Sequence, residues 1–331
     1  MANVLVTGAA GAIGMDLAFS LHQAKINVFG TEADKDNFSL VSEKCKYYNK
    51  VFQAPRAGTD NYIECINEII DSEDIDLIIP NPDFEVGFLS KVRSEIKSPL
   101  FLPSDETVQI LLSKFSTAEK IGNLAPRTYD IDTEDALQKA ISLERKVWLR
   151  PKTGAGGKGS LVVTDSKFGW MWIEYWSERG FSSSWIAQEY LEGGNYNVTL
   201  IYDRQSKLCA MGMLERLGYI HEAISPTGVT GDVRLAKTLK LDKIIEVATQ
   251  AVNLIDKTPL GIFSVDLMGE KVSEINPRFA GRPRLYTLSG ANLPAHIVDM
   301  ELNGINSYLE SKEGYKLIRQ VDIEPVAVQS I

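Results

Sequence analysis

The stretch Val265–Arg284, VDLMGEKVSEINPRFAGRPR, is the segment around which the sequence is organised. It contains two short runs of alternating apolar residues joined by a Gly-Glu-Lys link, a pattern that predicts a β-hairpin. If Asp266 and Glu274 lie on paired strands, their carboxylates can meet on one face. With the Asn276 carbonyl and Arg278 nearby, these groups suit Mg²⁺ carrying a polyphosphate. The alternative is a solvated polar hairpin whose Asn-Pro only makes a turn.

Composition limits the classes of protein that the chain can be. Its 331 residues suffice for two or three domains, and 44% hydrophobic with 24% charged residues is typical of globular proteins. The net charge of −9 argues against a nucleic-acid or anionic-membrane surface. The three cysteines and three histidines are scattered, which excludes a disulfide framework or zinc knuckle. The sequence shows neither a signal-peptide pattern nor a membrane-spanning run, so we expect a cytoplasmic protein that binds neither nucleic acid nor membrane.

The N-terminal part of the chain alternates between strand and helix patterns. Residues 3–7 form a buried-strand run, and the glycines of GAAGAIG (8–14) open a helix in the manner of a dinucleotide-binding loop. A second strand leads to Glu32, an acid that could bind a ribose hydroxyl. The alternative is that these glycines serve only the tight turn and helix–strand packing. Sequential βα units imply a parallel sheet, so residues 1–103 predict a small α/β domain, with a short strand at Leu100–Leu102.

A second glycine-rich segment, PKTGAGGKG at 151–159, joins two strand patterns at Val147–Arg150 and Ser160–Val163. A P-loop instead leads into a helix, so this is a different device. Its glycines let the backbone approach a phosphate, and neighbouring cations supply positive charge. The residues concerned are Gly154, Gly156, Gly157, Gly159, Arg150, Lys152 and Lys158. The alternative is a mobile hairpin tip with solvated lysines, but the density of glycines favours a phosphate site.

Other segments complete the pattern. Residues 104–124 predict one or two helices capped by Ser104, and Lys114 precedes the phosphate-type features. A strand at Trp185–Leu191 ends at a Glu-Gly-Gly hinge. The loop IHEAISPTGVTGD, which contains His221, is long enough to be functional, although a solvated histidine is the default. Residues 306–331 predict at most a strand and a tail.

The order of these parts resembles the ATP-grasp superfamily, in particular its carbamoyl-phosphate-synthase-like and carboxylate–amine ligase members. The resemblance covers residues 3–303 and rests on the α/β domain, the strand–glycine loop–strand unit, the QEYLEG segment and the Asp…Glu-x-Asn-x-Arg hairpin. It implies an α/β and α+β protein. A Rossmann-like pre-ATP-grasp domain without dinucleotide (1–103) would precede ATP-grasp subdomains at 104–190 and 191–305, followed by a C-terminal strand or tail.

The resemblance also implies roles for individual residues. Arg278, Arg150 and Asn276 would be catalytic, with Arg278 at the transferred phosphoryl group. One or two Mg²⁺ ions, or Mn²⁺ in their place, would be held by Asp266, Glu274 and Asn276. ATP would be bound through its phosphates by two cations and the glycine loop, and through adenine by the QEYL segment. These residues are Lys114, Arg150, Lys152, Gly154, Gly156, Gly157, Lys158, Gly159, Gln188, Glu189, Tyr190 and Leu191.

Two positions depart from the family pattern. Arg150 stands where many members have lysine, which keeps the charge but changes its geometry. Asn195 falls near the place where a carboxylate often holds the ribose.

A cluster of arginines follows the hairpin. Arg278, Arg282 and Arg284 repel one another unless anions share them, and guanidinium groups bind carboxylates bidentately. We therefore expect Arg282 to anchor an anionic acceptor substrate. The alternative is that Arg282 and Arg284 point to solvent or pair with acidic side chains.

The implied function is that of an ADP-forming ligase that joins a small-molecule carboxylate, such as an amino acid, to an amine through an acyl phosphate. A homodimer is left open. One alternative is an NAD-dependent epimerase or reductase, but the Tyr-x-x-x-Lys pair that such enzymes commonly need does not occur in the first domain. Another is a non-catalytic ATP-binding regulatory protein, against which the intact set of Asp266, Glu274, Asn276 and Arg278 argues.

Overall fold

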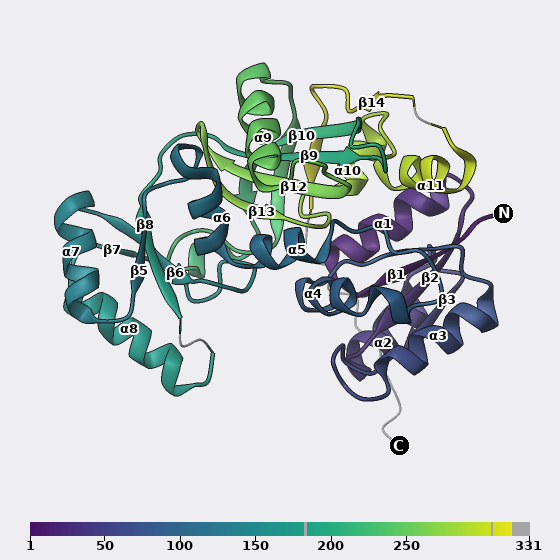
Figure 1. Cartoon of the computed structure of the whole chain (residues 1–331), viewed down its shortest axis with the longest axis horizontal. Helices are drawn as coiled ribbons and strands as arrows, with labels where there is room; N and C mark the ends of the chain where they lie inside the picture. Colours follow the sequence, from purple (N-terminus) through teal and green to yellow (C-terminus); the bar gives the residue numbers. More distant parts are fainter. Residues whose placement is uncertain (182–183, 306, 320–331) are drawn as a thin grey trace.

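The computed structural model describes residues 1–181, 184–305 and 307–319, and its elements form three sheets (Figure 1). In Figure 1 the N-terminal sheet lies at one end of the molecule and the small sheet with α7 and α8 at the other, with the largest sheet between them. The predicted combination of a Rossmann-like domain with a two-part α+β fold is confirmed. None of the described helices is long and apolar enough to cross a membrane.

The first sheet is parallel, in the order β3-β2-β1-β4. Its elements are β1 (Asn3–Thr7), α1 (Ala12–Gln23), β2 (Asn27–Glu32), α2 (Lys35–Lys44), β3 (Lys50–Gln53), α3 (Tyr62–Glu73), β4 (Leu77–Ile79) and α4 (Asp83–Lys91). The strand order reverses at β1, since β2 and β4 lie on opposite sides of it. In open α/β sheets this switch point creates a crevice at the carboxyl ends of the strands.

One predicted strand of this region is wrong. Leu100–Leu102 contributes a single bridge, from Leu100 to Ile78. Prolines at 99 and 103 flank this segment and have no amide proton to donate, so it cannot extend a ladder.

Two helices link the first sheet to the second, after a short 3₁₀ turn η1 (Arg93–Glu95). The predicted helical segment 104–124 divides at Ser113 into α5 (Asp105–Leu112) and α6 (Lys114–Ile121), followed by η2 (Gly122–Leu124). Ser104 Oγ accepts from Thr107 N at 3.2 Å, and Ser113 Oγ accepts from Ser116 N at 3.2 Å. Each serine therefore caps its own helix, and the second cap places Lys114 at the first helical position.

The second sheet is antiparallel, in the order β5-β8-β6-β7, and is covered by two helices. Its elements are β5 (Thr128–Ile131), α7 (Glu134–Glu144), β6 (Val147–Pro151), β7 (Leu161–Val163), α8 (Ser166–Glu178) and β8 (Trp185–Glu189). Leu137, Val147, Leu149 and Trp185 are buried in a hydrophobic cluster of its own. This part of the chain therefore has a separate core.

The third sheet has the order β13-β12-β9-β10-β11-β15, with β14 beside β10. Its strands are β9 (Asn195–Tyr202), β10 (Leu208–Tyr219), β11 (Val233–Thr238), β12 (Gly261–Met268), β13 (Lys271–Asn276), β14 (Leu309–Glu310) and β15 (Lys316–Ile318). Its helices are η3 (Glu222–Ile224), α9 (Asp242–Ile255), α10 (Pro283–Leu288) and α11 (Leu293–Asn303). The predicted tail thus supplies two short strands rather than one, and residues 320–331 lie outside the described part.

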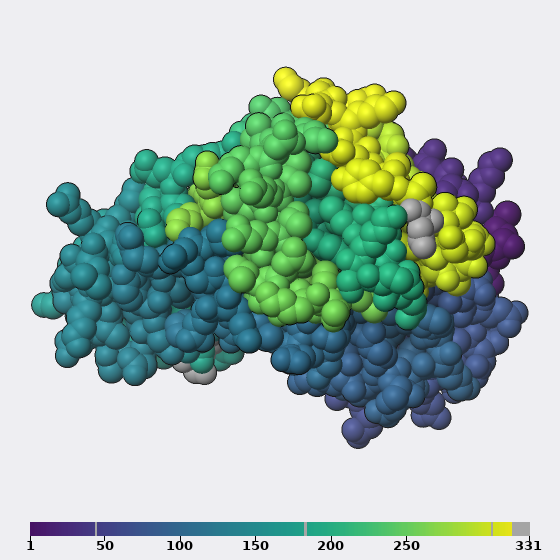
Figure 2. All heavy atoms as spheres, turned by 45° about the horizontal axis from the view of Figure 1, so that its top comes forward, coloured from purple at the N-terminus to yellow at the C-terminus, as the bar shows by residue number. Residues whose placement is uncertain are grey.

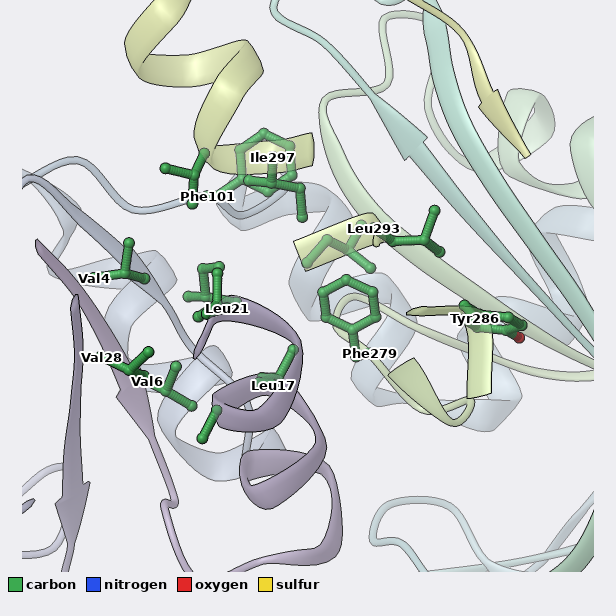
Figure 3. Close-up of a cluster of buried hydrophobic side chains, with 14 of the residues drawn as sticks. Val4, Val6, Leu17, Leu21, Val28, Phe101, Phe279, Tyr286, Leu293 and Ile297 are labelled. Carbon is green, nitrogen blue, oxygen red and sulfur yellow. The ribbon is translucent and has the colours of Figure 1, made fainter. Parts of the chain in front are cut away.

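The N-terminal and third sheets share one hydrophobic core (Figure 3). Leu17 and Leu21 of α1 belong to the same buried cluster as Tyr286, Leu293 and Ile297 of the C-terminal helices. Figure 2 shows the same relationship on the surface, where the C-terminal segment in yellow lies against N-terminal residues in purple. The first and last parts of the described chain therefore form one packed unit, to which the second sheet is attached.

Candidate active site

A cavity of about 1320 Å³ is lined by residues from all three sheets. The N-terminal domain contributes the loops that follow β1, β2 and β4. The second sheet contributes most of the glycine loop after β6 and the end of β8, and the third contributes the β12–β13 hairpin. The loop between β10 and β11 also lines it. The loop that contains His221 therefore contributes to the site through residues between Thr227 and Val233.

The hairpin has the predicted geometry. Asp266 on β12 lies opposite Glu274 on β13, and Asn276 lies opposite Ser264. Directly opposed residues of an antiparallel pair project from the same face, so the two carboxylates are neighbours. A bulge follows Asp266. All three polar residues Asp266, Glu274 and Asn276 line the cavity.

Each carboxylate faces cations from elsewhere in the chain. Glu274 lies 3.4 Å from Lys114 Nζ and 3.6 Å from Arg150 Nη1. Asp266 accepts hydrogen bonds from Arg216 Nη2 at 2.7 Å and from Asn197 Nδ2 at 2.6 Å. Three cations thus surround two carboxylates, which leaves the cluster with an excess of positive charge.

The three cationic side chains are largely buried. Burial lowers the pKa of Arg150 in spite of the neighbouring Glu274 and Asp266. Burial is the largest single influence on the pKa of Arg216 and lowers it, but Asp266, Tyr219 and Tyr286 together raise it by more, so the net shift is upward. Lys114 is 8% exposed, and its backbone N donates to Lys152 O at 2.9 Å. Because a buried cation is stabilised only by nearby negative groups, these residues are suited to an anionic ligand.

The donor set fits Mg²⁺. Two carboxylates and one amide carbonyl are hard oxygen ligands, which this ion prefers. No cluster of three or more His, Cys, Asp or Glu side chains that could hold a metal occurs among the described residues. A Mg²⁺ ion here would therefore need phosphate oxygens from a nucleotide to complete its shell, as is usual for this ion.

The glycine loop forms one wall of the cavity. Gly154, Gly156, Gly157 and Gly159 have φ angles of 105°, 71°, 68° and 77°, which strongly favour glycine. A Cβ built on Gly231 would lie 2.9 Å from Gly156 Cα, so the loop after β6 touches the loop before β11.

The lysines of the glycine loop have other partners. Lys152 pairs with Asp130 at 2.7 Å, and Lys158 Nζ lies 4.3 Å from the ring centre of Phe181. Neither side chain lines the cavity in this conformation, nor does Gly159. The phosphate roles expected for these three residues stay predictions.

The QEYL segment also lines the cavity. Gln188 is 3% exposed and donates to Thr128 Oγ1 at 2.9 Å, while Glu189 is tied through its backbone N to Arg127 O. Strand β8 ends at Glu189, so the backbone of Tyr190 and Leu191 lies beyond the ladder. An adenine edge could therefore be read by backbone groups there, as the sequence led us to expect.

Two of the hairpin arginines contact the N-terminal domain. Arg278 donates to Asp83 through Nε at 2.5 Å and Nη2 at 2.9 Å. Arg282 is 6% exposed and donates to Asp16 of α1 at 3.0 Å. Burial raises the pKa of Asp16, and this outweighs the opposing effect of Arg282 and Arg284. Arg282 thus already has a carboxylate partner, and its role as a substrate anchor stays a prediction.

The N-terminal glycine loop is occupied by a side chain of the protein itself. Glu32 Oε2 accepts from Ala10 N at 3.1 Å, and Glu32 Oε1 accepts from Ala33 N at 3.0 Å. A carboxylate therefore stands at an amide that a pyrophosphate would use. A Cβ on Gly8 would lie 2.4 Å from Pro82, and one on Gly14 would lie 2.3 Å from Gly8 O. These contacts favour the packing interpretation of the glycines over dinucleotide binding.

Several cavity residues were not found by sequence reasoning. Arg216 and Asp83 carry no local signal, since their partners lie 50 and 195 residues away. Asn197, which is fully buried behind the cavity wall and bonds to Asp266, had a signal that could have been used. It alternates with Asn195 and Thr199 along β9, a polar face on a strand that is otherwise apolar.

The comparisons with known proteins agree with this geometry. Residues 112–282, just over half of the chain, match the ATP-grasp domain family, and the chain therefore belongs to that family. The resemblance inferred from the sequence is confirmed. A comparison with curated protein sequences finds no match.

Solved structures share the fold over nearly the whole chain. N5-carboxyaminoimidazole synthetase from Staphylococcus aureus, complexed with ADP, is similar with a TM-score of 0.68 and 16% identity over 94% of this chain and 80% of that one. Carboxyaminoimidazole ribonucleotide synthase from Aspergillus clavatus, complexed with ATP, has a TM-score of 0.66 and 17% identity, also over 94% of this chain and 80% of that one. Biotin carboxylase from Campylobacter jejuni has a TM-score of 0.64 and 17% identity over 90% of this chain and 70% of that one.

Proposed function

We propose that the chain is an ADP-forming ligase that joins a small-molecule carboxylate to an amine. The observation that carries the proposal is the opposed pair Asp266 and Glu274, facing Lys114 and Arg150 in a cavity that the glycine loop lines. Membership of the ATP-grasp family and neighbours solved with ATP and ADP support the nucleotide.

The chemistry proceeds in two transfers. A substrate carboxylate oxygen bonds to the γ-phosphorus of ATP, the bond to the β-phosphate oxygen breaks, and ADP leaves. The ammonium group of the amine first gives one proton to water. The lone pair of the neutral nitrogen then bonds to the acyl carbon, the bond to the phosphorylated oxygen breaks, and the departing phosphate takes the second proton of the nitrogen. Mg²⁺ bound at Asp266, Glu274 and Asn276 would offset the charge of the phosphate oxygens.

The residues of this chain position and stabilise the reacting groups. Lys114, Arg150 and Arg278 would neutralise the transferred phosphoryl group, with Arg150 oriented by its bond to Ser273 O at 2.6 Å. The contact between the glycine loop and Gly231 would exclude water from the acyl phosphate. Gln188 to Leu191 would hold adenine.

The test is ADP release with MgATP across a matrix of carboxylates and amines. Bicarbonate, acetate and the amino acids are the carboxylates, since the names of two neighbours indicate carboxylation and the carboxylate of this chain is unassigned. We expect one carboxylate to elicit ADP release that a matching amine accelerates. A Glu274→Gln variant measures the background. Release that never exceeds this background in any pair would contradict the proposal.

A further inference from the structure

The N-terminal-domain end of the cavity contains buried oxygens without partners. Thr31, Asn81 and Glu85 line the cavity and are only 1%, 8% and 6% exposed. Thr31 Oγ1, Asn81 Oδ1 and Glu85 Oε2 are each buried without a hydrogen bond in the described part of the chain. Buried polar atoms are nearly always paired, so three orphans at one end of a cavity indicate a missing ligand.

The three residues are brought together by Thr7, the last residue of β1. Thr31 is its register partner on β2, and Asn81 N donates to Thr7 Oγ1 at 3.1 Å. Thr7 also lies beside Glu85 in the first turn of α4, where its side chain acts to lower the pKa of that carboxyl, and Glu85 Oε1 accepts from Tyr62 Oη at 2.9 Å. This cluster lies at the carboxyl edge of the parallel sheet, at the switch point where β2 and β4 flank β1 on opposite sides. Ligands of open α/β sheets bind in that crevice.

The charge of this cluster favours a cationic ligand. A carboxylate and an amide carbonyl accept hydrogen bonds, so the ligand group must donate. No basic side chain within the described ranges forms an ion pair with Glu85. Burial raises the pKa of Glu85 to about 7, and Glu32 adds to this in the same direction. A buried carboxylate in acidic surroundings gains from a cation more than from a neutral hydroxyl.

The cluster is coupled to the hairpin by a short path. Asp83, two residues before Glu85, pairs with Arg278, which is two residues after Asn276. Each two-residue step spans at most about 7 Å. The subsite therefore lies near the place proposed for the transferred phosphoryl group.

We propose that Glu85, Asn81 and Thr31 bind the ammonium group of the amine substrate, which is thus a primary amine. This rests on the proposed ligase function and assigns its second substrate. The carboxylate and ATP occupy the rest of the cavity, and the N-terminal domain thereby selects the acceptor.

Binding is tested without turnover, on the full chain with Mg²⁺ and a non-hydrolysable ATP analogue. The probes are ethanolamine and 1,4-diaminobutane, with ethylene glycol and 1,4-butanediol as matched neutral controls. We expect the amines to raise Tm more than the diols do. Glu85→Gln, which keeps the shape, should abolish the difference, and Thr31→Val should reduce it. Glu64→Gln, an exposed acid on α3, is the matched control and should retain it.

The kinetic test separates this subsite from the proposed function. In Glu85→Gln the KM for the amine should rise about 10- to 100-fold, while the KM for ATP stays within about twofold. The carboxylate-dependent exchange of isotope within ATP, which needs no amine, should continue. Amines that stabilise no more than diols, or equal amine KM values in Glu85→Gln and wild type, overturn the subsite. If wild type shows no isotope exchange within ATP with any of the carboxylates tested, the proposed ligase function is overturned instead.

Discussion

Asp266 and Glu274 lie directly opposite each other on β12 and β13, and each faces a cation from another part of the chain. Arg216 pairs with Asp266, whereas Lys114 and Arg150 flank Glu274. Mg²⁺ could replace these cations at the carboxylates, and the cations would then be free to meet phosphate oxygens. The same groups can therefore balance the charge of the carboxylates in the free protein and that of the phosphates in a nucleotide complex.

Glu274→Gln should keep the fold but lower turnover by roughly 100-fold or more, because it removes a charged metal ligand of the same shape. Steady-state ADP release and circular dichroism would check both parts. Glu270→Gln, in the exposed link of the same hairpin, is the control and should remain active. Turnover near that of wild type in Glu274→Gln would remove this residue from the proposed site.

MgATP should stabilise the protein, and NAD(H) should not. Glu32 already accepts the Ala10 amide, so the N-terminal glycine loop offers a carboxylate where a dinucleotide would place its pyrophosphate. Thermal unfolding with each nucleotide in excess gives the comparison, with a Tm rise of several degrees expected for MgATP alone. A shift with NAD(H) and none with MgATP would reverse the assignment of the nucleotide.

Arg282→Met should lower the free energy of unfolding by about 3–5 kcal/mol, because it leaves the Asp16 carboxylate buried without its main partner. The double variant Asp16→Leu/Arg282→Met should recover most of this loss, since well-packed apolar groups can replace a buried pair. Urea unfolding of wild type, Arg282→Met and the double variant would measure these differences in the free energy of unfolding. An unchanged stability together with a raised KM for the carboxylate would instead support Arg282 as the substrate anchor.

Glu85 should make stability depend on pH. The pKa of Glu85 is about 7 in the folded protein against an ordinary value of 4.5, so the folded state holds the proton more tightly than the unfolded chain. The stabilisation by the neutral acid is fully present below about pH 4.5 and lost as the pH rises to about 7. Relative to Glu85→Gln, wild type should lose roughly 3 kcal/mol across that window. Urea unfolding at about pH 4.5 and about pH 7 would measure this change, with Glu64→Gln as control. If the assignment is wrong, the difference in free energy of unfolding between wild type and Glu85→Gln will be the same at both pH values.

The elements with strong local patterns could be predicted from the sequence. The β12–β13 hairpin follows from alternation, and the glycine loop from glycine density. The helix α2 was missed because KDNFSLVSEK has few apolar residues, and its cap at Asp34 was not recognised. The helix α10 was missed because Pro283 follows an arginine-rich turn, although proline is well suited to a first helical position.

The candidate site could be predicted only where its residues are neighbours in sequence. Asp266, Glu274 and Asn276 share one hairpin, so their meeting follows from strand register. Arg216 reaches Asp266 only because β9 lies between β10 and β12. That strand order is a property of the whole sheet, and no short segment encodes it.

The shared core of the N-terminal and third sheets has a consequence for synthesis on the ribosome. Asp16 and Arg282 are 266 residues apart, and α1 packs on α10 and α11, near the end of the described chain, as well as on its own sheet. The apolar surface of α1 that α10 and α11 cover therefore stays exposed until almost the entire chain has been made. The β5–β8 body can close its own core much earlier, since all its strands lie between Thr128 and Glu189. A ribosome stalled between these two points would present a finished β5–β8 body attached to an N-terminal domain with an exposed helix.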